Sequence, residues 1–455
     1  MQLGTWVRVR VGRRKYPMVA TALVCAVGLG VMFGVDPIYA HTSGWYTPGD
    51  EWGVLRGAHY VGWGYLGGIY SSGTGIVTLP GFSVLLAPVA MISYHFHLTE
   101  SYSPIFLRHP TAALLLQPAE LLLTSSVIFA ADALAERLDV TAGRRVVLCG
   151  AIASLALPVA VVWGHAEDAL AMTFAIYALI AWLDRKWARS GWILGFGIVM
   201  QPLALLILPL IIGASPAGQR VKTAIRATAL SAVLVGIAAL GNAAGTFSAI
   251  VRQPSTSYSN HATPWLALAP RIATPGIMVG QPFSLGATNG HATLKLAAGS
   301  LQHPVVVSGG PGRAIYLVIA VLLGIFVWRR PQPPPRVLWL CAAILAARCV
   351  FEAFICPYYL APPLFLALVM GSRGSRSRFG AALMISAAAS IYAYLYLDPW
   401  IWWLPVVAGL AAVVGLGYPT VGVKKAEEPN GVPVDRILIE RAAIPTEVRL
   451  LEPTS

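Results

Sequence analysis

Two adjacent carboxylates, Asp50 and Glu51, follow a Pro-Gly pair and directly precede Trp52. Aromatic residues are dense over the next twenty positions, at Tyr60, Trp63, Tyr65 and Tyr70. Aromatic rings bind sugar faces or lie at the level of lipid headgroups. A carboxylate beside them can accept a proton from an acceptor hydroxyl. The same residues also suit a simpler role, in which Asp50 caps a helix that begins at Glu51.

A second group of ionisable side chains lies in the short connection Gly-His-Ala-Glu-Asp, where His165, Glu167 and Asp168 stand between two apolar segments. Such a set can ligate a divalent metal, hold an acceptor sugar or provide an alternative base. Acidic residues are also favoured at a helix N-terminus by the helix dipole. Because the dipole leaves His165 unexplained, the functional interpretation is the stronger one.

Three further candidates lie in apolar surroundings, where ionisable groups are costly and mark functional sites. Arg348 and Glu352 are four residues apart, so they share a helix face and can pair with each other. In the alternative, Arg348 holds a phosphate, with Tyr358 or Tyr359 nearby. Glu120 stands alone in its apolar segment, as a protonated packing residue, a partner of a basic group or part of a proton path.

The segment 246–312 contains no Asp or Glu. Its basic side chains are Arg252, His261, Arg271, His291, Lys295 and His303. A surface without acidic residues suits an anionic ligand such as a lipid phosphate. General attraction to anionic headgroups is the alternative.

The composition excludes a soluble domain. Hydrophobic residues make up 57% of the chain and charged residues 11%, and mean hydropathy is +0.68, whereas soluble domains carry about 25% charged residues. We therefore expect an all-α polytopic membrane protein with about eleven or twelve membrane segments. The segments are 17–35, 76–95, 111–133, 146–163, 168–184, 190–213, 225–245, 313–328, 337–355, 357–371, 379–396 and 400–418.

The net charge of +13 comes from basic clusters at the ends of these segments, which favours the positive-inside pattern over nucleic-acid binding. With all clusters in the cytoplasm, both termini are inside, and 36–75 and 246–312 are extracytoplasmic loops. This requires 190–213 to enter the membrane and leave it on the same side. It would do so as two helical segments separated by a break, which we call the broken pair. It also requires that only one of the two apolar segments 76–95 and 111–133 crosses the membrane. Residues 1–418 form the membrane domain, and 419–455 reads as a flexible cytoplasmic tail.

Several short motifs resemble the GT-C class of membrane glycosyltransferases, and in particular the actinobacterial branch that uses polyprenyl-phosphate mannose. Asp50 is followed by Gly67-Gly68-Ile69-Tyr70 and Leu79-Pro80-Gly81-Phe82. The turn 164–168 matches a Gly-His/Gln-x-x-Asp/Asn step, and Gln201-Pro202 stands where many relatives have Lys-Pro. The resemblance covers about residues 15–418.

The resemblance implies inverting transfer of a mannose- or arabinose-type sugar from a polyprenyl-phosphate donor to a glycolipid or polysaccharide acceptor of the cell envelope. The reaction would take place at the outer face of a bacterial plasma membrane. Asp50 would be the general base, with Glu51 or Asp36 as alternatives. The acceptor site would contain Trp52, His165, Glu167 and Asp168, with or without a divalent cation. The donor phosphate would contact His261, Arg271, Arg348, Tyr358 and Tyr359.

Two other classes of protein fit the same sequence. A transporter or flippase for a lipid-linked saccharide would place Glu120 and the Arg348–Glu352 pair on a proton or substrate path. The sequence has no internal repeat that would support this class. A non-catalytic scaffold of envelope assembly would make both carboxylate groups dispensable.

Overall fold

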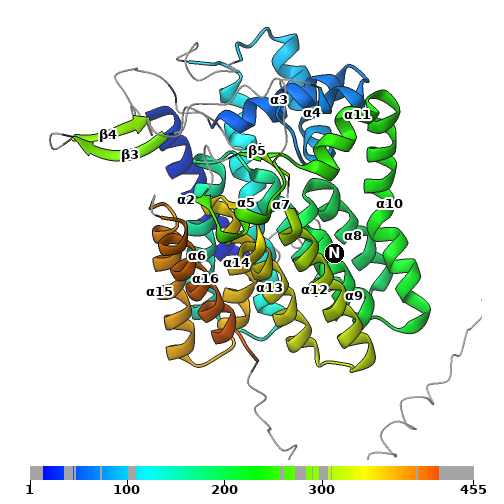
Figure 1. The fold of residues 1–455 in the computed structure, drawn as a ribbon. Helices are drawn as coiled ribbons and strands as arrows, with labels where there is room; N and C mark the ends of the chain where they lie inside the picture. Colours follow the sequence, from blue (N-terminus) through cyan, green and yellow to red (C-terminus); the bar gives the residue numbers. More distant parts are fainter. Residues whose placement is uncertain are drawn as a thin grey trace, which may run out of the picture. The chain divides into compact units, whose positions relative to one another are not determined.

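The computed structural model describes residues 14–34, 45, 48–71, 74–100, 109–256, 261–271, 283–288, 291–296, 306–308, 310–395 and 398–419. Asp36 and the tail from residue 420 lie outside these ranges. Eight helices in the described part are long and apolar enough to cross a membrane (Figure 1). They are α2 with its π-helical end (Lys15–Gly34), α5 (Ala113–Arg137), α6 (Ala142–Val161), α7 (Ala166–Leu183), α10 (Ala217–Gly241), α12 (Gly310–Arg329), α13 (Pro334–Phe351) and α16 (Pro399–Leu416). The predicted all-α polytopic membrane fold is confirmed.

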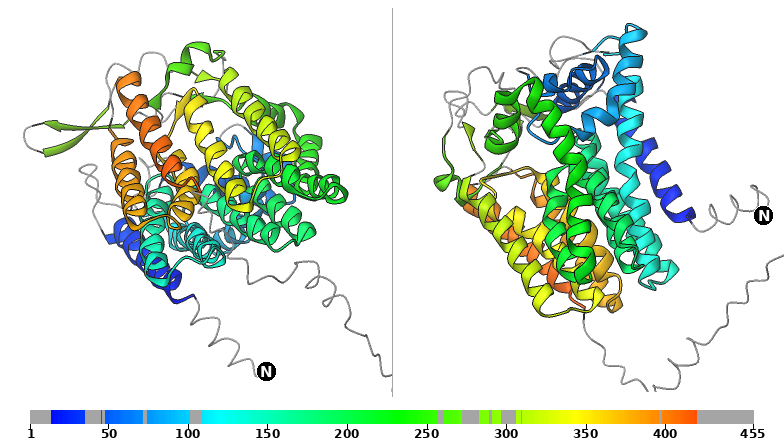
Figure 2. Two further views of the ribbon diagram at one scale, coloured as in Figure 1. Left: turned by 90° about the horizontal axis from the view of Figure 1, so that it is seen from below. Right: turned by 90° about the vertical axis from the view of Figure 1, so that its right-hand side faces the viewer.

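Ion pairs gather the basic clusters at one end of the helices. Asp132 near the end of α5 accepts from Arg14 at 2.7 Å and from Arg145 of α6 at 2.8 Å. Arg144 donates to two carbonyls of the turn after α14, and Arg137 pairs with Asp184 after α7 at 2.9 Å. The turns at 138–141, 184–186, 215–216, 330–333 and 372–375 define this basic end. Figure 1 shows the α9–α10 and α12–α13 turns at the bottom, and α3 lies at the top in the right-hand view of Figure 2.

Two helices at the centre of the bundle position the opposite end, which we call the site end. Of the apolar 18-residue stretch in each helix, 78% is buried in α7, against 11% in α10. Every residue of α14 (Ala361–Gly371) is buried. The small residues of α7 allow its neighbours α5 and α8 to approach closely. The first turn of α7 and the residues just before α14 are therefore held by close packing.

The segment 190–213 folds as the predicted broken pair. Helix α8 (Trp187–Met200) ends at Gln201, whose backbone is extended, and the chain turns back through η3 (Pro202–Ile207) and α9 (Leu208–Ala214). Gly191 in α8 lies against the first turns of α10, with Thr223 and Arg226 nearest to it. The pair therefore begins and ends near the basic end, while its turn at Gln201 reaches Thr78 and the first turn of α7 at the opposite end.

The structure also shows which apolar run in 76–133 spans. Helix α5 has 25 residues, whereas α4 (Gly81–His95) has 15 and packs against α3 (Gly49–Gly62). The short η2 (Leu66–Tyr70) connects to the same region and contacts α3 and α10. The predicted loop 36–75 thus contains a helix, and its first turn carries Asp50 and Glu51.

Short strands order part of the segment between α10 and α12. After α11 (Ala243–Phe247) and η4 (Ser248–Arg252), β1 (Ser255–Thr256) pairs with β5 (Val306–Val307), and β3 (Phe283–Thr288) pairs with β4 (His291–Leu296). β2 (His261–Ala262), which precedes η5 (Pro264–Leu268), pairs with β6 (Phe354–Ile355) after α13. This last pairing ties the segment to the chain between Glu352 and η6 (Pro357–Leu360). The helix α15 (Arg376–Tyr392) then precedes α16.

Candidate functional site

The centre of the candidate site is the imidazole of His165, which lies between two carboxylates. Its Nε2 is 3.2 Å from Asp50 Oδ2, and its Nδ1 is 2.6 Å from Glu167 Oε1. Asp50 comes from the first turn of α3 and Glu167 from the first turn of α7. An ionised carboxylate only accepts hydrogen bonds, so both ring nitrogens of His165 must donate. The predicted groups around Asp50 and His165 therefore form one cluster.

The charges of this cluster favour a positively charged imidazole. Burial opposes protonation of His165, but the carboxylates of Glu167 and Asp50 outweigh it and raise the pKa of the imidazole well above its usual range. The side chain of His165 is 20% exposed, and that of Glu167 is 3% exposed. His165 is thus a positively charged group that lies between the buried carboxylate of Glu167 and the exposed carboxylate of Asp50.

The structure separates the two members of the predicted carboxylate doublet. The side chain of Asp50 is 67% exposed, whereas Glu51 is fully buried and accepts a hydrogen bond from Gln117 of α5. Burial raises the pKa of Glu51 to about 8, so this carboxyl is neutral at pH 7. Glu120 lies beside it and is also fully buried. Of the doublet, only Asp50 is accessible to an external hydroxyl.

A row of stacked side chains connects His165 to Arg348. The imidazole stacks on Tyr358 with centroids 4.4 Å apart and an angle of 21°. Tyr358 contacts Tyr359 edge-on at 4.8 Å, and the Arg348 guanidinium lies 4.2 Å from the centroid of the Tyr359 ring. Arg348 and Asp168 are close enough for their charges to interact. The structure therefore brings the predicted acceptor group and part of the predicted donor group together.

Glu352 has closer partners than Arg348. Arg313 of α12 donates to Glu352 Oε2 at 3.2 Å, and the Tyr316 hydroxyl donates to Oε1 at 3.0 Å. The Nε of Arg348 is 3.8 Å from the same carboxylate. Sequence reasoning did not find Arg313 and Tyr316 as partners, although their spacing of three residues places them on one helix face. Arg348 and Glu352 thus form the ion pair expected from their spacing, and Arg313 is the closer partner of Glu352.

Other predicted site residues are placed differently. Trp52 is 1% exposed and belongs to the hydrophobic core, so its ring is not presented to an acceptor. His261 stacks on Trp402 at 4.2 Å, and burial lowers the pKa of its imidazole to about 4. His261 is therefore neutral at pH 7 and adds no charge for a donor phosphate. Arg271 is exposed next to β5, and within the described residues no contact joins it to the His165 cluster.

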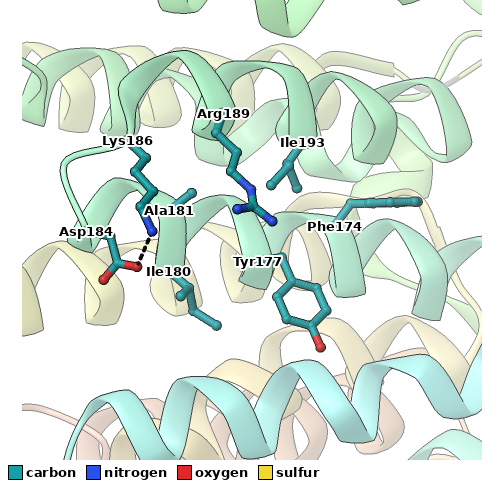
Figure 3. A pocket seen from close by; sticks show the side chains of 8 residues that line it. All are labelled: Phe174, Tyr177, Ile180, Ala181, Asp184, Lys186, Arg189 and Ile193. Carbon is teal, nitrogen blue, oxygen red and sulfur yellow. Dashed lines mark hydrogen bonds and ion pairs between the residues drawn. The ribbon is translucent and has the colours of Figure 1, made fainter. Parts of the chain in front are cut away.

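Two pockets lie away from this cluster. One of about 350 Å³ lies between α7 and α8 at the basic end, with Asp184, Lys186 and Arg189 at its rim (Figure 3). Lys186 pairs with Asp184 at 3.5 Å at one edge of it. The other, of about 680 Å³, lies between α9, α10 and α12 and is mostly apolar. Neither contains a residue of the His165 cluster.

No protein-family model matches this sequence, and no curated protein matches it either. The residues that suggested the GT-C resemblance include Asp50, His165 and Asp168, which the fold brings to the site end. The possible chemistry of the site is therefore argued from these side chains and their contacts alone.

Proposed function

We propose that this chain is an inverting glycosyltransferase of GT-C type, which transfers a sugar from a polyprenyl-phosphate donor to a glycolipid or polysaccharide of the cell envelope. One observation carries the proposal. An exposed carboxylate, Asp50, is held by His165 at one end of a stacked row whose other end is the cation Arg348. Sugar transfer from a lipid phosphate needs a base for the acceptor and a cation for the leaving group.

In the proposed reaction, the Asp50 carboxylate accepts the proton of the acceptor hydroxyl while that oxygen attacks the anomeric carbon. The bond from the anomeric carbon to the phosphate oxygen breaks on the opposite face, so the configuration inverts. Polyprenyl phosphate leaves with the bonding electrons. The Nε2–H group of His165 orients Asp50, and Arg348 stabilises the charge that develops on the phosphate.

The distribution of basic residues supports an orientation in the membrane. The basic end carries the arginines of five turns, and α2 begins and α16 ends there. By the positive-inside rule, this end faces the cytoplasm and the site end faces outward. A bacterial plasma membrane with an outward-facing site gives Asp50 access to envelope acceptors.

The direct test is sugar transfer by the purified chain in nanodiscs, with a panel of polyprenyl-phosphate sugars and an envelope-lipid extract as acceptor. We expect one donor to be consumed, with equal amounts of glycosylated acceptor and polyprenyl phosphate formed. Anomeric analysis of the product should show inversion. Consumption of no donor in the panel by a folded, monodisperse protein would contradict the proposal.

Replacing Arg348 tests the leaving-group site. Arg348→Gln should raise the KM for the donor by about 10- to 100-fold, because a hydrogen bond to a charged group is worth ~1.5–3 kcal/mol. The control is Arg252→Gln, which removes one exposed cation at the same end of the bundle. Steady-state kinetics with the active donor measure both variants. An unchanged KM in Arg348→Gln would remove this arginine from the donor site.

A transporter for a lipid-linked saccharide is the second candidate, and one observation favours it. Glu120 of α5 is fully buried beside Glu51, and such an intramembrane acid suits a proton path. In proteoliposomes, a transporter would move the lipid-linked sugar between leaflets and release no polyprenyl phosphate. The transfer assay above therefore separates the two functions.

A further inference from the structure

We propose that His165, Glu167 and Asp168 bind a divalent metal cation, which would hold the donor phosphate. The role of the cation rests on the proposed function, but the binding site itself does not. Each residue offers one ligand atom, and the three atoms lie within 4.8 Å of one another. Two donors at about 2.1 Å from one ion lie up to about 4.2 Å apart. A small closure of the side chains is therefore sufficient.

Unpaired oxygens provide the second, independent observation. Asp168 is 2% exposed, and neither of its carboxylate oxygens has a partner at hydrogen-bond distance, although the side chain of Gln201 lies nearby. The Oε2 atom of Glu167, which is 3% exposed, also lacks one. Buried acceptors without partners cost about 1–3 kcal/mol each, and more when they are charged. A bound cation would give a partner to an oxygen of each carboxylate.

The dipole of α7 does not explain this arrangement. Glu167 and Asp168 lie in the first turn, where the dipole favours acidic residues. The dipole favours an acidic charge there but provides no hydrogen-bond donor to the carboxylate oxygens, and those of Asp168 have none at hydrogen-bond distance. The dipole also gives no reason for His165 Nδ1 to lie 2.6 Å from Glu167. Metal binding needs a neutral imidazole, so the cation would displace the proton on Nδ1 of His165.

The ligand types narrow the choice of cation. One imidazole nitrogen with carboxylate oxygens favours Mn²⁺ or Zn²⁺, because Ca²⁺ and Mg²⁺ prefer sites made of oxygen alone. Three protein ligands leave at least one coordination position open. A phosphate oxygen of the donor can take that position, on the side of the cluster where Arg348 interacts with Asp168.

The test measures binding of the metal alone. The full chain in detergent is stripped with a chelator and titrated with Mn²⁺, and free Mn²⁺ is followed by electron paramagnetic resonance, with Zn²⁺ as competitor. We expect one Mn²⁺ per chain, displaced by Zn²⁺, and binding at least tenfold weaker in Asp168→Asn. Asp398→Asn is the matched control, because Asp398 caps α16 at the site end and Asn is an equally good cap.

His165→Gln provides a second variant that removes a ligand, should Asp168→Asn fail to fold. Wild-type protein that binds neither cation, or unchanged affinity in a folded ligand variant, would overturn the inference. Sugar transfer that continues in the chelator, with no metal bound, would also overturn it and would leave the proposed function in place. Mn²⁺ binding without transfer from any donor would support the metal site and contradict the proposed function.

Discussion

Asp50→Asn is expected to lower kcat for sugar transfer by about 10²- to 10⁴-fold, which is the usual contribution of a positioned general base. The amide has nearly the same size and can still accept a hydrogen bond from His165. It cannot take up the proton of the acceptor hydroxyl. The KM for the donor should change little, because Asp50 is not a ligand of the proposed cation and does not contact Arg348. Single-turnover kinetics with the active donor measure the effect.

Two variants show whether this loss is specific. Asp398→Asn removes an acidic charge at the site end but keeps the cap, in which the side chain accepts from the Trp400 N–H, so its kcat should equal that of wild type. Glu51→Gln should also retain most activity, because burial already keeps that carboxyl neutral at pH 7. Full activity of Asp50→Asn would assign the base to another carboxylate and contradict the proposed mechanism.

Gly164→Ala should reduce transfer by at least about 10²-fold without a change at any ionisable residue. Gly164 has a φ of +65°, and a Cβ there would lie 2.4 Å from Glu51 Cγ and 2.9 Å from Pro48 Cβ. An alanine is therefore strained, and it pushes the start of α3 away from the turn before α7. The contact between Asp50 and His165 depends on this approach, and displacements of about 1 Å can cost 10²-fold in rate.

Gly150→Ala is the matched control for this steric effect. Gly150 lies in α6, and a Cβ there would meet nothing within 4 Å, so alanine should preserve activity and slightly increase thermal stability. Melting temperatures and transfer rates of both variants are compared in the same detergent. If Gly164→Ala retains wild-type activity, the α3–α7 contact does not position the base.

The sequence predicted the class of fold and the broken pair at 190–213, because apolar length and Gly-Pro breaks are local signals. It left Asp50 and Glu51 as alternatives. Neighbouring residues on a helix differ by about 100° in direction, and the rotation of α3 depends on packing against Gln117. Only the folded chain therefore shows which carboxylate is exposed.

The closest partners of Glu352 were not predictable for a similar reason, although its ion pair with Arg348 is present. The four-residue spacing from Arg348 indicates a helical pair, but α13 ends at Phe351 and Glu352 has extended backbone angles. Its carboxylate consequently lies closer to Arg313 of α12 than to Arg348. His261 was predicted to be a basic contact from its loop, and burial against Trp402 removes that charge. Long-range packing decides both cases.

The turn-back at Gln201 has a consequence for how the chain enters the membrane. Because α8 and α9 begin and end near the basic end, the pair leaves the direction of every later helix unchanged. Helix α10 would start from the same side with or without it. The pair thus adds an even number of passages through the bundle, and every helix after it keeps its direction in the membrane.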